Sequence, residues 1–167
     1  MDPDSATDRM LAGMSTDHPT GISAQTSHIG LCVADLERSL RFYCDGLGFA
    51  KVLTYELDDT MMPGLDKGLE VSAPVAVTSQ FIELDGLKIE LLGYRSPPPT
   101  GEPSSSRGTI GMTHMSFYVD DVDVAAARLV ECGGTIIDST RVSLGIEIVF
   151  LADPDGSRVE LMAPKPT

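Results

Sequence analysis

The chain has 167 residues and a formal net charge of −13 at pH 7, from 12 Lys and Arg against 25 Asp and Glu. This length suits one compact domain that buries about 70 per cent of its unfolded surface. The negative charge disfavours nucleic acids and anionic membranes as partners, because their phosphate groups would be repelled. No stretch approaches the roughly 18 apolar residues that span a bilayer, and the first residues do not resemble a secretory signal. We therefore expect a cytoplasmic protein.

The three cysteines, Cys32, Cys44 and Cys132, are an odd number without CxxC spacing, and they lie within apolar patterns. This arrangement predicts reduced packing residues in an intracellular protein and disfavours a disulfide framework.

Residues 1–24 are polar and non-periodic, which predicts a poorly ordered tail; His18 lies there and receives no role. From Thr26 apolar and polar residues alternate, as in a half-buried strand. Asp35 then has the position of a helix N-cap, and Gly46 that of a helix end.

Strands are predicted at about 49–57 and 75–84, separated by the loop 58–74. Because that loop is long for a compact domain, we regard it as a candidate lid over a binding site. Asp85-Gly86 predicts a tight hairpin turn that leads into the strand LKIELLGY.

The Pro-, Ser- and Gly-rich segment 95–110 predicts a linker between module one (26–94) and module two (111–164) of a single domain over 25–166. Module two repeats the order of module one, with a helix capped by Asp121 and strands at about 111–119, 134–142, 146–152 and 157–163. The expected fold is α+β: two βαβββ modules forming a curled eight-stranded mixed sheet, with helices against one face.

Each module carries one histidine and one glutamate at matching positions. His28 lies seven residues before Asp35, and His114 lies seven residues before Asp121. Glu90 and Glu160 each lie four residues after the glycine of an Asp-Gly turn. Strand alternation puts all four on the face opposite the apolar residues.

The repeat favours a metal site over ordinary structural roles. Considered alone, each histidine is expected to be a hydrogen-bonded structural residue. Each glutamate, considered alone, is expected to form a surface ion pair with the nearby Lys88 or Arg158. Their equivalence in two modules instead predicts that two imidazoles and two carboxylates bind one divalent ion. This donor set suits Zn, Ni, Co, Mn or Fe.

Four motifs, SHIGLCVADLERSLRFYCDGLGF, KIELLGY, MTHMSFYVDDV and ADPDGSRVELMAP, resemble the vicinal oxygen chelate superfamily over residues 26–164. This superfamily includes glyoxalase I, methylmalonyl-CoA epimerase, extradiol dioxygenases, fosfomycin-resistance enzymes and bleomycin-resistance proteins. The resemblance implies the glyoxalase/bleomycin resistance/dihydroxybiphenyl dioxygenase fold and a homodimer. It also implies that the metal ligands are His28, Glu90, His114 and Glu160.

The chain is most similar to the glyoxalase I and methylmalonyl-CoA epimerase types. This similarity implies a metal-dependent isomerase or lyase acting on a small molecule with two adjacent oxygens. The reaction would be proton transfer next to a carbonyl, through a metal-stabilised enediolate or enolate. Glu160 would be the base and Glu90 its symmetric counterpart. The sequence leaves open which of the two is displaced from the metal when the substrate binds.

Two other readings remain open. An extradiol-type dioxygenase uses two histidines and one carboxylate, so a fourth protein ligand at Glu90 disfavours oxygen chemistry. A non-catalytic drug-binding protein of the bleomycin-resistance type needs no metal ligands, so the His and Glu set disfavours this function. The acidic surface, in contrast, would suit a cationic drug.

Overall fold

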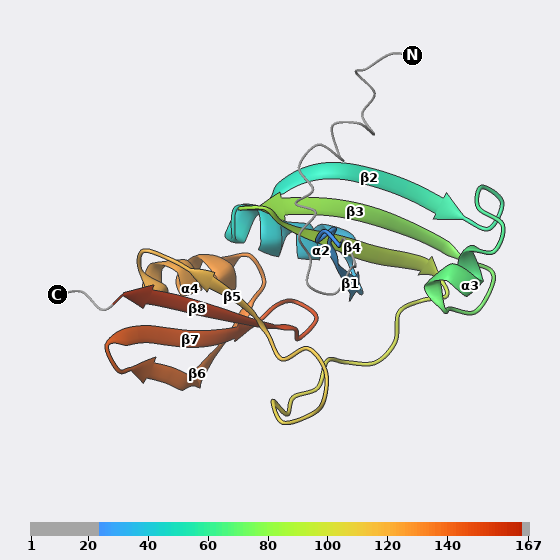
Figure 1. Cartoon of the computed structure of the whole chain (residues 1–167). Coiled ribbons are helices and arrows are strands. Elements are labelled where there is room, and N and C mark those ends of the chain that lie inside the picture. The colour runs from blue at the N-terminus through green and yellow to red at the C-terminus, as the bar shows by residue number, and fades with distance from the viewer. Residues whose placement is uncertain (1–23, 165–167) are drawn as a thin grey trace, which may run out of the picture.

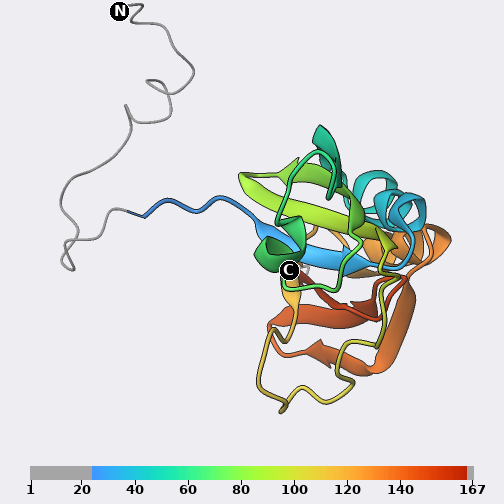
Figure 2. The same cartoon turned by 90° about the vertical axis from the view of Figure 1, so that its right-hand side faces the viewer.

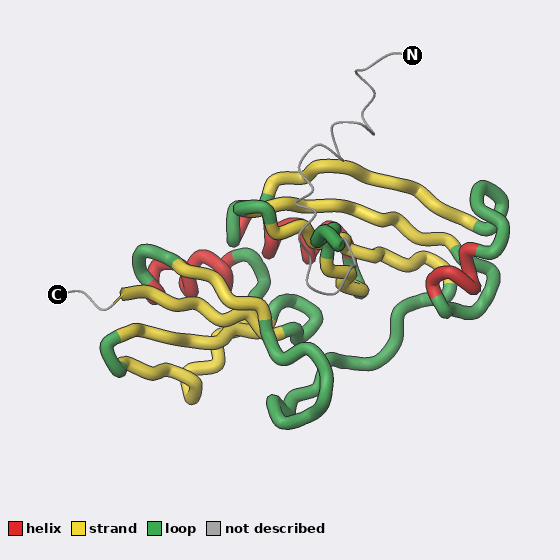
Figure 3. Tube along the Cα trace, viewed as in Figure 1, coloured by secondary structure: helices red, strands yellow, loops and turns green. Residues whose placement is uncertain are grey.

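The computed structural model describes residues 24–164, so residues 1–23 of the predicted tail, with His18, lie outside the described residues. The chain forms two βαβββ modules (Figures 1 and 3). Module one contains β1 Ile29–Val33, α2 Leu36–Leu40, the π-helical segment η1 Arg41–Gly46, β2 Ala50–Asp58, α3 Leu65–Leu69, β3 Ala76–Leu84 and β4 Leu87–Ser96. Module two contains β5 Met115–Tyr118, α4 Val122–Glu131, β6 Thr135–Ser143, β7 Ile146–Ala152 and β8 Arg158–Pro164.

The eight strands form two four-stranded mixed sheets with matching orders, β1-β4-β3-β2 and β5-β8-β7-β6. In each sheet the first strand is parallel to the last, and the other neighbours are antiparallel. The predicted modules are therefore confirmed, but the edges of β1 and β5 do not join into one continuous sheet. Alternation predicts the faces of a strand and carries no information about which edges meet.

The predicted helix N-caps and hairpin turn are confirmed by local hydrogen bonds and backbone angles. The Asp35 carboxylate accepts from the backbone N–H of Arg38, and that of Asp121 accepts from the two backbone N–H groups at the start of α4. Asp85 and Gly86 have φ values of 49° and 80°, the left-handed pair that a tight hairpin turn requires.

One apolar core joins the two modules. It contains residues from the inner faces of both sheets and from the helices, including Ile82, Ile89, Leu91, Leu129, Val149, Val159 and Leu161. Segment η1 packs beside α4 (Figure 2). The chain segments approach closely at this contact: a Cβ at Gly134 would lie 2.6 Å from Phe42 Cε2, and one at Gly46 would lie 2.8 Å from the end of the Leu129 side chain, Cδ2.

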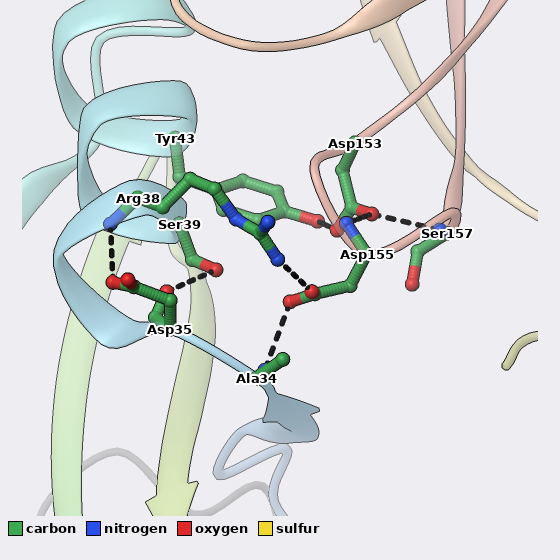
Figure 4. A network of polar contacts seen from close by, with 8 residues as sticks. All are labelled: Ala34, Asp35, Arg38, Ser39, Tyr43, Asp153, Asp155 and Ser157. Carbon is green, nitrogen blue, oxygen red and sulfur yellow. Dashed lines mark hydrogen bonds and ion pairs between the residues drawn. The ribbon is translucent and has the colours of Figure 1, made fainter. Parts of the chain in front are cut away.

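Polar contacts also cross between the modules (Figure 4). One Asp155 oxygen accepts from the backbone N–H of Ala34, at 3.1 Å, and the other forms an ion pair with Arg38. These contacts fix the last turn of module two, between β7 and β8, against the start of the helix of module one.

The segment between β2 and β3 packs on the other side of the first sheet. Leu65 of α3 and Val75 form a second, smaller cluster with Val77 of β3, and Leu92 and Tyr94 of β4 pack against it. Since Ile89 and Leu91 face the main core, Leu92 and Tyr94 lie on the same face as Glu90. The candidate lid is thus placed on the glutamate face; its opening and closing remain a prediction.

The cysteines are all free, with Cys132 buried, Cys44 half-buried and Cys32 exposed. The predicted packing role therefore applies to Cys132 and not to Cys32. Among the described residues, no helix has the length and hydropathy that a membrane crossing needs.

Candidate metal centre

The structure brings the four predicted ligands together as two pairs. His28 Nε2 lies 3.1 Å from Glu90 Oε2, and His114 Nε2 lies 3.5 Å from Glu160 Oε2. Each histidine stands one residue before the first strand of its module, and each glutamate lies on the parallel last strand. The parallel pairing of these strands is what sets histidine beside glutamate in both modules.

Each histidine ring is held by two equivalent contacts. Nδ1 lies 2.9 Å from Ser27 Oγ in module one and 3.0 Å from Thr113 Oγ1 in module two. Each imidazole also forms a T-shaped contact with an aromatic ring, Phe81 or Phe150, with centroids 5.1 Å apart. A metal-ligating histidine usually has a hydrogen-bond partner at its other ring nitrogen, and here a hydroxyl occupies that position and leaves Nε2 directed at the carboxylate.

The donor atoms have separations that fit a shared metal ion. Bonds of about 2.1 Å at angles between about 90° and 109° separate two ligand atoms by about 3.0 to 3.4 Å. The observed 3.1 Å between Nε2 and Oε2 lies within this range, and the observed 3.5 Å lies just above it. The four side chains are partly shielded, with 34% and 33% of the histidines and 18% and 13% of Glu90 and Glu160 exposed.

The carboxylates differ in their serine partners. Ser79 on β3, which is buried, donates to Glu90 Oε1, whereas His28 contacts Oε2. Ser116 on β5 donates to Glu160 Oε2 at 2.6 Å, the same oxygen that faces His114. Both oxygens of Glu90 therefore have a partner. In Glu160, Oε2 makes both contacts and Oε1 has no partner among residues 24–164.

The two pairs do not meet within one chain. Among the described residues, no group of three or more His, Cys, Asp or Glu side chains is close enough to hold a metal ion. Glu90 alternates with the core residues Ile89 and Leu91, and Glu160 alternates with Val159 and Leu161. Both pairs therefore lie on sheet faces directed away from the core that the modules share.

The ion pairs that would give the glutamates an ordinary surface role are absent from the described residues. Lys88 instead approaches Glu83, at 3.7 Å, and Arg158 Nη1 donates to the carbonyl of Gly156. Each glutamate pairs with the histidine of its own module.

Several residues of this site did not emerge from the sequence. Ser27 and Thr113 precede the two histidines, and Phe81 and Phe150 stand opposite the two glutamates in register, so the internal repeat was the signal that would have found them. Ser79 and Ser116 occupy positions that are not equivalent, and no repeat signal marks them.

The sequence profile of the Glyoxalase/Bleomycin resistance protein/Dioxygenase superfamily matches residues 25–161. The chain belongs to this superfamily. It is 31% identical over 141 residues to an uncharacterised protein, YaeR, of Escherichia coli K12, covering 82% of the chain and 94% of that protein. It is 30% identical over 151 residues to an ethylmalonyl-CoA/methylmalonyl-CoA epimerase of Cereibacter sphaeroides, covering 81% of the chain and 94% of that enzyme.

A third superfamily relative, the catechol-2,3-dioxygenase of Bacillus subtilis 168, is 28% identical over 148 residues. That match covers 85% of this chain but spans only 43% of the dioxygenase. Among solved structures, a glyoxalase family protein of Bacillus cereus has a TM-score of 0.73 at 15% identity, covering 89% of this chain and 99% of that one. The fosfomycin resistance protein FosX of Listeria monocytogenes, solved with Mn(II) and sulfate, has a TM-score of 0.54 at 19% identity, covering 86% and 95%. These structures show a common fold.

Proposed function

We propose that the protein is a divalent-metal-dependent isomerase or lyase that moves a proton next to a carbonyl. The observation that carries this proposal is the pair of equivalent His–Glu contacts, at 3.1 and 3.5 Å, with both Nε2 atoms directed at carboxylate oxygens. His28, Glu90, His114 and Glu160 would hold the ion, and the epimerase relative supports the reaction class.

The chain's own residues divide the work as follows. His28 and His114 would bind the ion through Nε2, and Ser27 and Thr113 orient the two rings. Glu160, whose Oε1 has no partner among the residues that the structure describes, accepts the substrate proton and returns it. The ion, when bound, supplies a Lewis acid that stabilises negative charge on the substrate oxygen.

We propose that two copies of the chain complete each site. The pairs lie on sheet faces that point away from the shared core, and three ligands do not come together within the described part of one chain. One edge of β1 and one edge of β5 have no strand partner in the described chain, and an unpaired edge can pair with another copy. In a two-fold dimer, His28 and Glu90 of one chain would meet His114 and Glu160 of the other, which gives two sites per dimer.

The second candidate is an extradiol-type dioxygenase, which the Bacillus subtilis relative favours. A facial triad of two histidines and one carboxylate would need one module to contribute its histidine alone. Glu90 lies at least as close to His28 as Glu160 lies to His114, so the geometry gives no reason to leave Glu90 out of the ligand set. With four protein ligands, an octahedral ion keeps two positions, enough for a chelating substrate and too few for substrate and dioxygen together. A purely drug-binding role leaves both His–Glu pairs unexplained.

The experiment that separates these functions uses metal-free protein loaded in turn with Ni²⁺, Co²⁺, Mn²⁺, Zn²⁺ and Fe²⁺. Each form is incubated in deuterated water with 2-substituted acyl-CoA thioesters and with thiol hemiacetals, and with catechol in an oxygen electrode. We expect deuterium to enter next to a carbonyl without oxygen uptake. Oxygen-dependent catechol cleavage without deuterium incorporation would replace this function with the dioxygenase.

A further inference from the structure

A cavity of about 290 Å³ lies beside His114, where the edges of β1 and β5 meet the linker. Its lining combines both modules and the linker: Gly30, Leu31, Pro103, Ser104, Arg107, Met112, Thr113, His114, Met115, Ser157 and Arg158. Of the described residues that line this cavity, two are arginines and none is a carboxylate. In a chain of net charge −13, such a concentration of positive charge is a local feature that the composition does not predict.

Both arginines are held at the cavity by the backbone. Arg158 Nη1 donates to the Gly156 carbonyl at 2.8 Å, and Arg107 Nη1 donates to the Thr113 carbonyl. Within residues 24–164 neither forms an ion pair with a carboxylate, whereas Arg38, Lys88, Arg95, Arg128 and Arg141 each do. The remaining guanidinium donors therefore have no acidic partner in the described chain.

The cavity also adjoins the candidate metal centre. His114 is part of its lining, and Arg158 lies two residues before Glu160 on the same face of β8. An anionic group in the cavity would sit next to the His114–Glu160 pair, so one molecule can reach both.

We propose that Arg107 and Arg158 form a subsite for an anionic group of the substrate, a carboxylate or a phosphate. A guanidinium presents a planar fork of donors that matches either group, and two such forks around one small cavity can bind an anion together. This subsite would select, among molecules with two adjacent oxygens, those that also carry a negative group. The role of the anion in catalysis rests on the proposed function; its binding does not.

The test uses full-length protein from which metal has been removed, in low-salt buffer, titrated with inorganic phosphate and, separately, with malonate. Isothermal titration calorimetry gives the affinity for each probe. Tighter binding of phosphate or of malonate identifies the class of anion that the subsite prefers. We expect Arg107→Gln and Arg158→Gln each to weaken binding about tenfold, the usual scale of one charge-assisted hydrogen bond. Arg95→Gln is the matched control, because it removes the same charge from an exposed arginine paired with Glu56.

A second variant tests the place of binding without changing charge. A Cβ at Gly30 would meet no atom within 4 Å, so Gly30→Val is compatible with the strand and adds a side chain at a residue that lines the cavity. We expect it to weaken binding of both probes. Equal weakening by Arg95→Gln, full binding by Gly30→Val, or no binding of either probe by wild type would overturn the subsite. Failure of metal uptake by wild type would instead overturn the proposed function, because the anion titration uses no metal.

Discussion

The Tyr43 hydroxyl donates a 2.8 Å hydrogen bond to Asp153 Oδ2 across 110 residues of sequence (Figure 4). Tyr43 lies in η1 of module one and is fully buried, and Asp153 lies in the turn between β7 and β8 of module two. The other carboxylate oxygen accepts from the backbone N–H groups of Asp155 and Ser157. Burial, and then the charge of Asp153, raises the pKa of Tyr43 well above its ordinary value, so the phenol stays protonated.

Replacing this tyrosine should weaken the joint between the modules. We expect Tyr43→Phe to lower the free energy of unfolding by about 1 to 3 kcal/mol at pH 7, because Asp153 Oδ2 loses its donor inside the protein. Urea unfolding measures the difference. Tyr118→Phe is the control, since its side chain is exposed and should change stability by less than about 0.5 kcal/mol.

The contribution of Tyr43 should also depend on pH. Its pKa is higher in the folded than in the unfolded state, so its stabilisation is fully present below the unfolded value of about 10 and is lost as pH rises toward the folded value. The difference in unfolding free energy between wild type and Tyr43→Phe should therefore shrink between about pH 10 and 11. A difference that stays constant from pH 9 to 11 would contradict this linkage.

A mixing experiment tests whether two chains share each site. His28→Ala and His114→Ala should each abolish tight metal binding when purified alone. Co-expression of the two variants with different tags should restore about one quarter of the wild-type metal content, since about half of the dimers are mixed and each has one intact site of two. Metal analysis of the mixed sample decides the matter, because a site built within one chain gives no restoration.

The two glutamates should respond differently to loss of charge. With metal at saturation, we expect Glu160→Gln to lower turnover by about 10² to 10⁴, the usual contribution of a positioned base. Glu90→Gln should mainly weaken metal binding and keep more of its turnover at saturation, because both oxygens of Glu90 are occupied by His28 and Ser79. Equal turnover in both variants would show that the two carboxylates are interchangeable.

The serine partners provide an independent check of this asymmetry. Ser79→Ala should weaken metal affinity by about 10- to 100-fold, the usual effect of removing a hydrogen-bond partner from a metal ligand. Ser116→Ala should weaken it less, because Ser116 is exposed and water can replace its hydroxyl. Competition with a coloured chelator measures both affinities. Ser39→Ala, which removes a buried hydroxyl bonded to the Asp35 carbonyl, is the control for general damage.

The repeat of histidine and glutamate was visible in the sequence because each module places them at fixed spacings from a helix cap and a hairpin turn. Alternation then predicted that Ile89 and Leu91 face the core while Glu90 faces away, which the structure confirms. The strand expected at 111–119 is shorter, Met115–Tyr118, because β8 pairs with only those residues. The residues before Met115 have no partner strand in the described chain.

Two features were beyond sequence reasoning for physical reasons. How the modules meet depends on the close packing of η1 against α4, and no strand or helix period encodes the approach of Gly46 to Leu129. The serines that hold Glu90 and Glu160 come from different strands, β3 in one module and β5 in the other. Only the register of the folded sheets brings them to the carboxylates.

The α3 segment breaks the likeness of the two halves. Seventeen residues separate β2 from β3, whereas Leu144 and Gly145 alone join β6 to β7. Within residues 24–164, only module one therefore has a second apolar cluster on its glutamate face. A molecule in contact with both glutamate faces would therefore lie beside the α3 segment in module one and beside no equivalent segment in the described part of module two. The two His–Glu pairs repeat as near copies but their surroundings do not, so a molecule bound across both modules would have one fixed orientation.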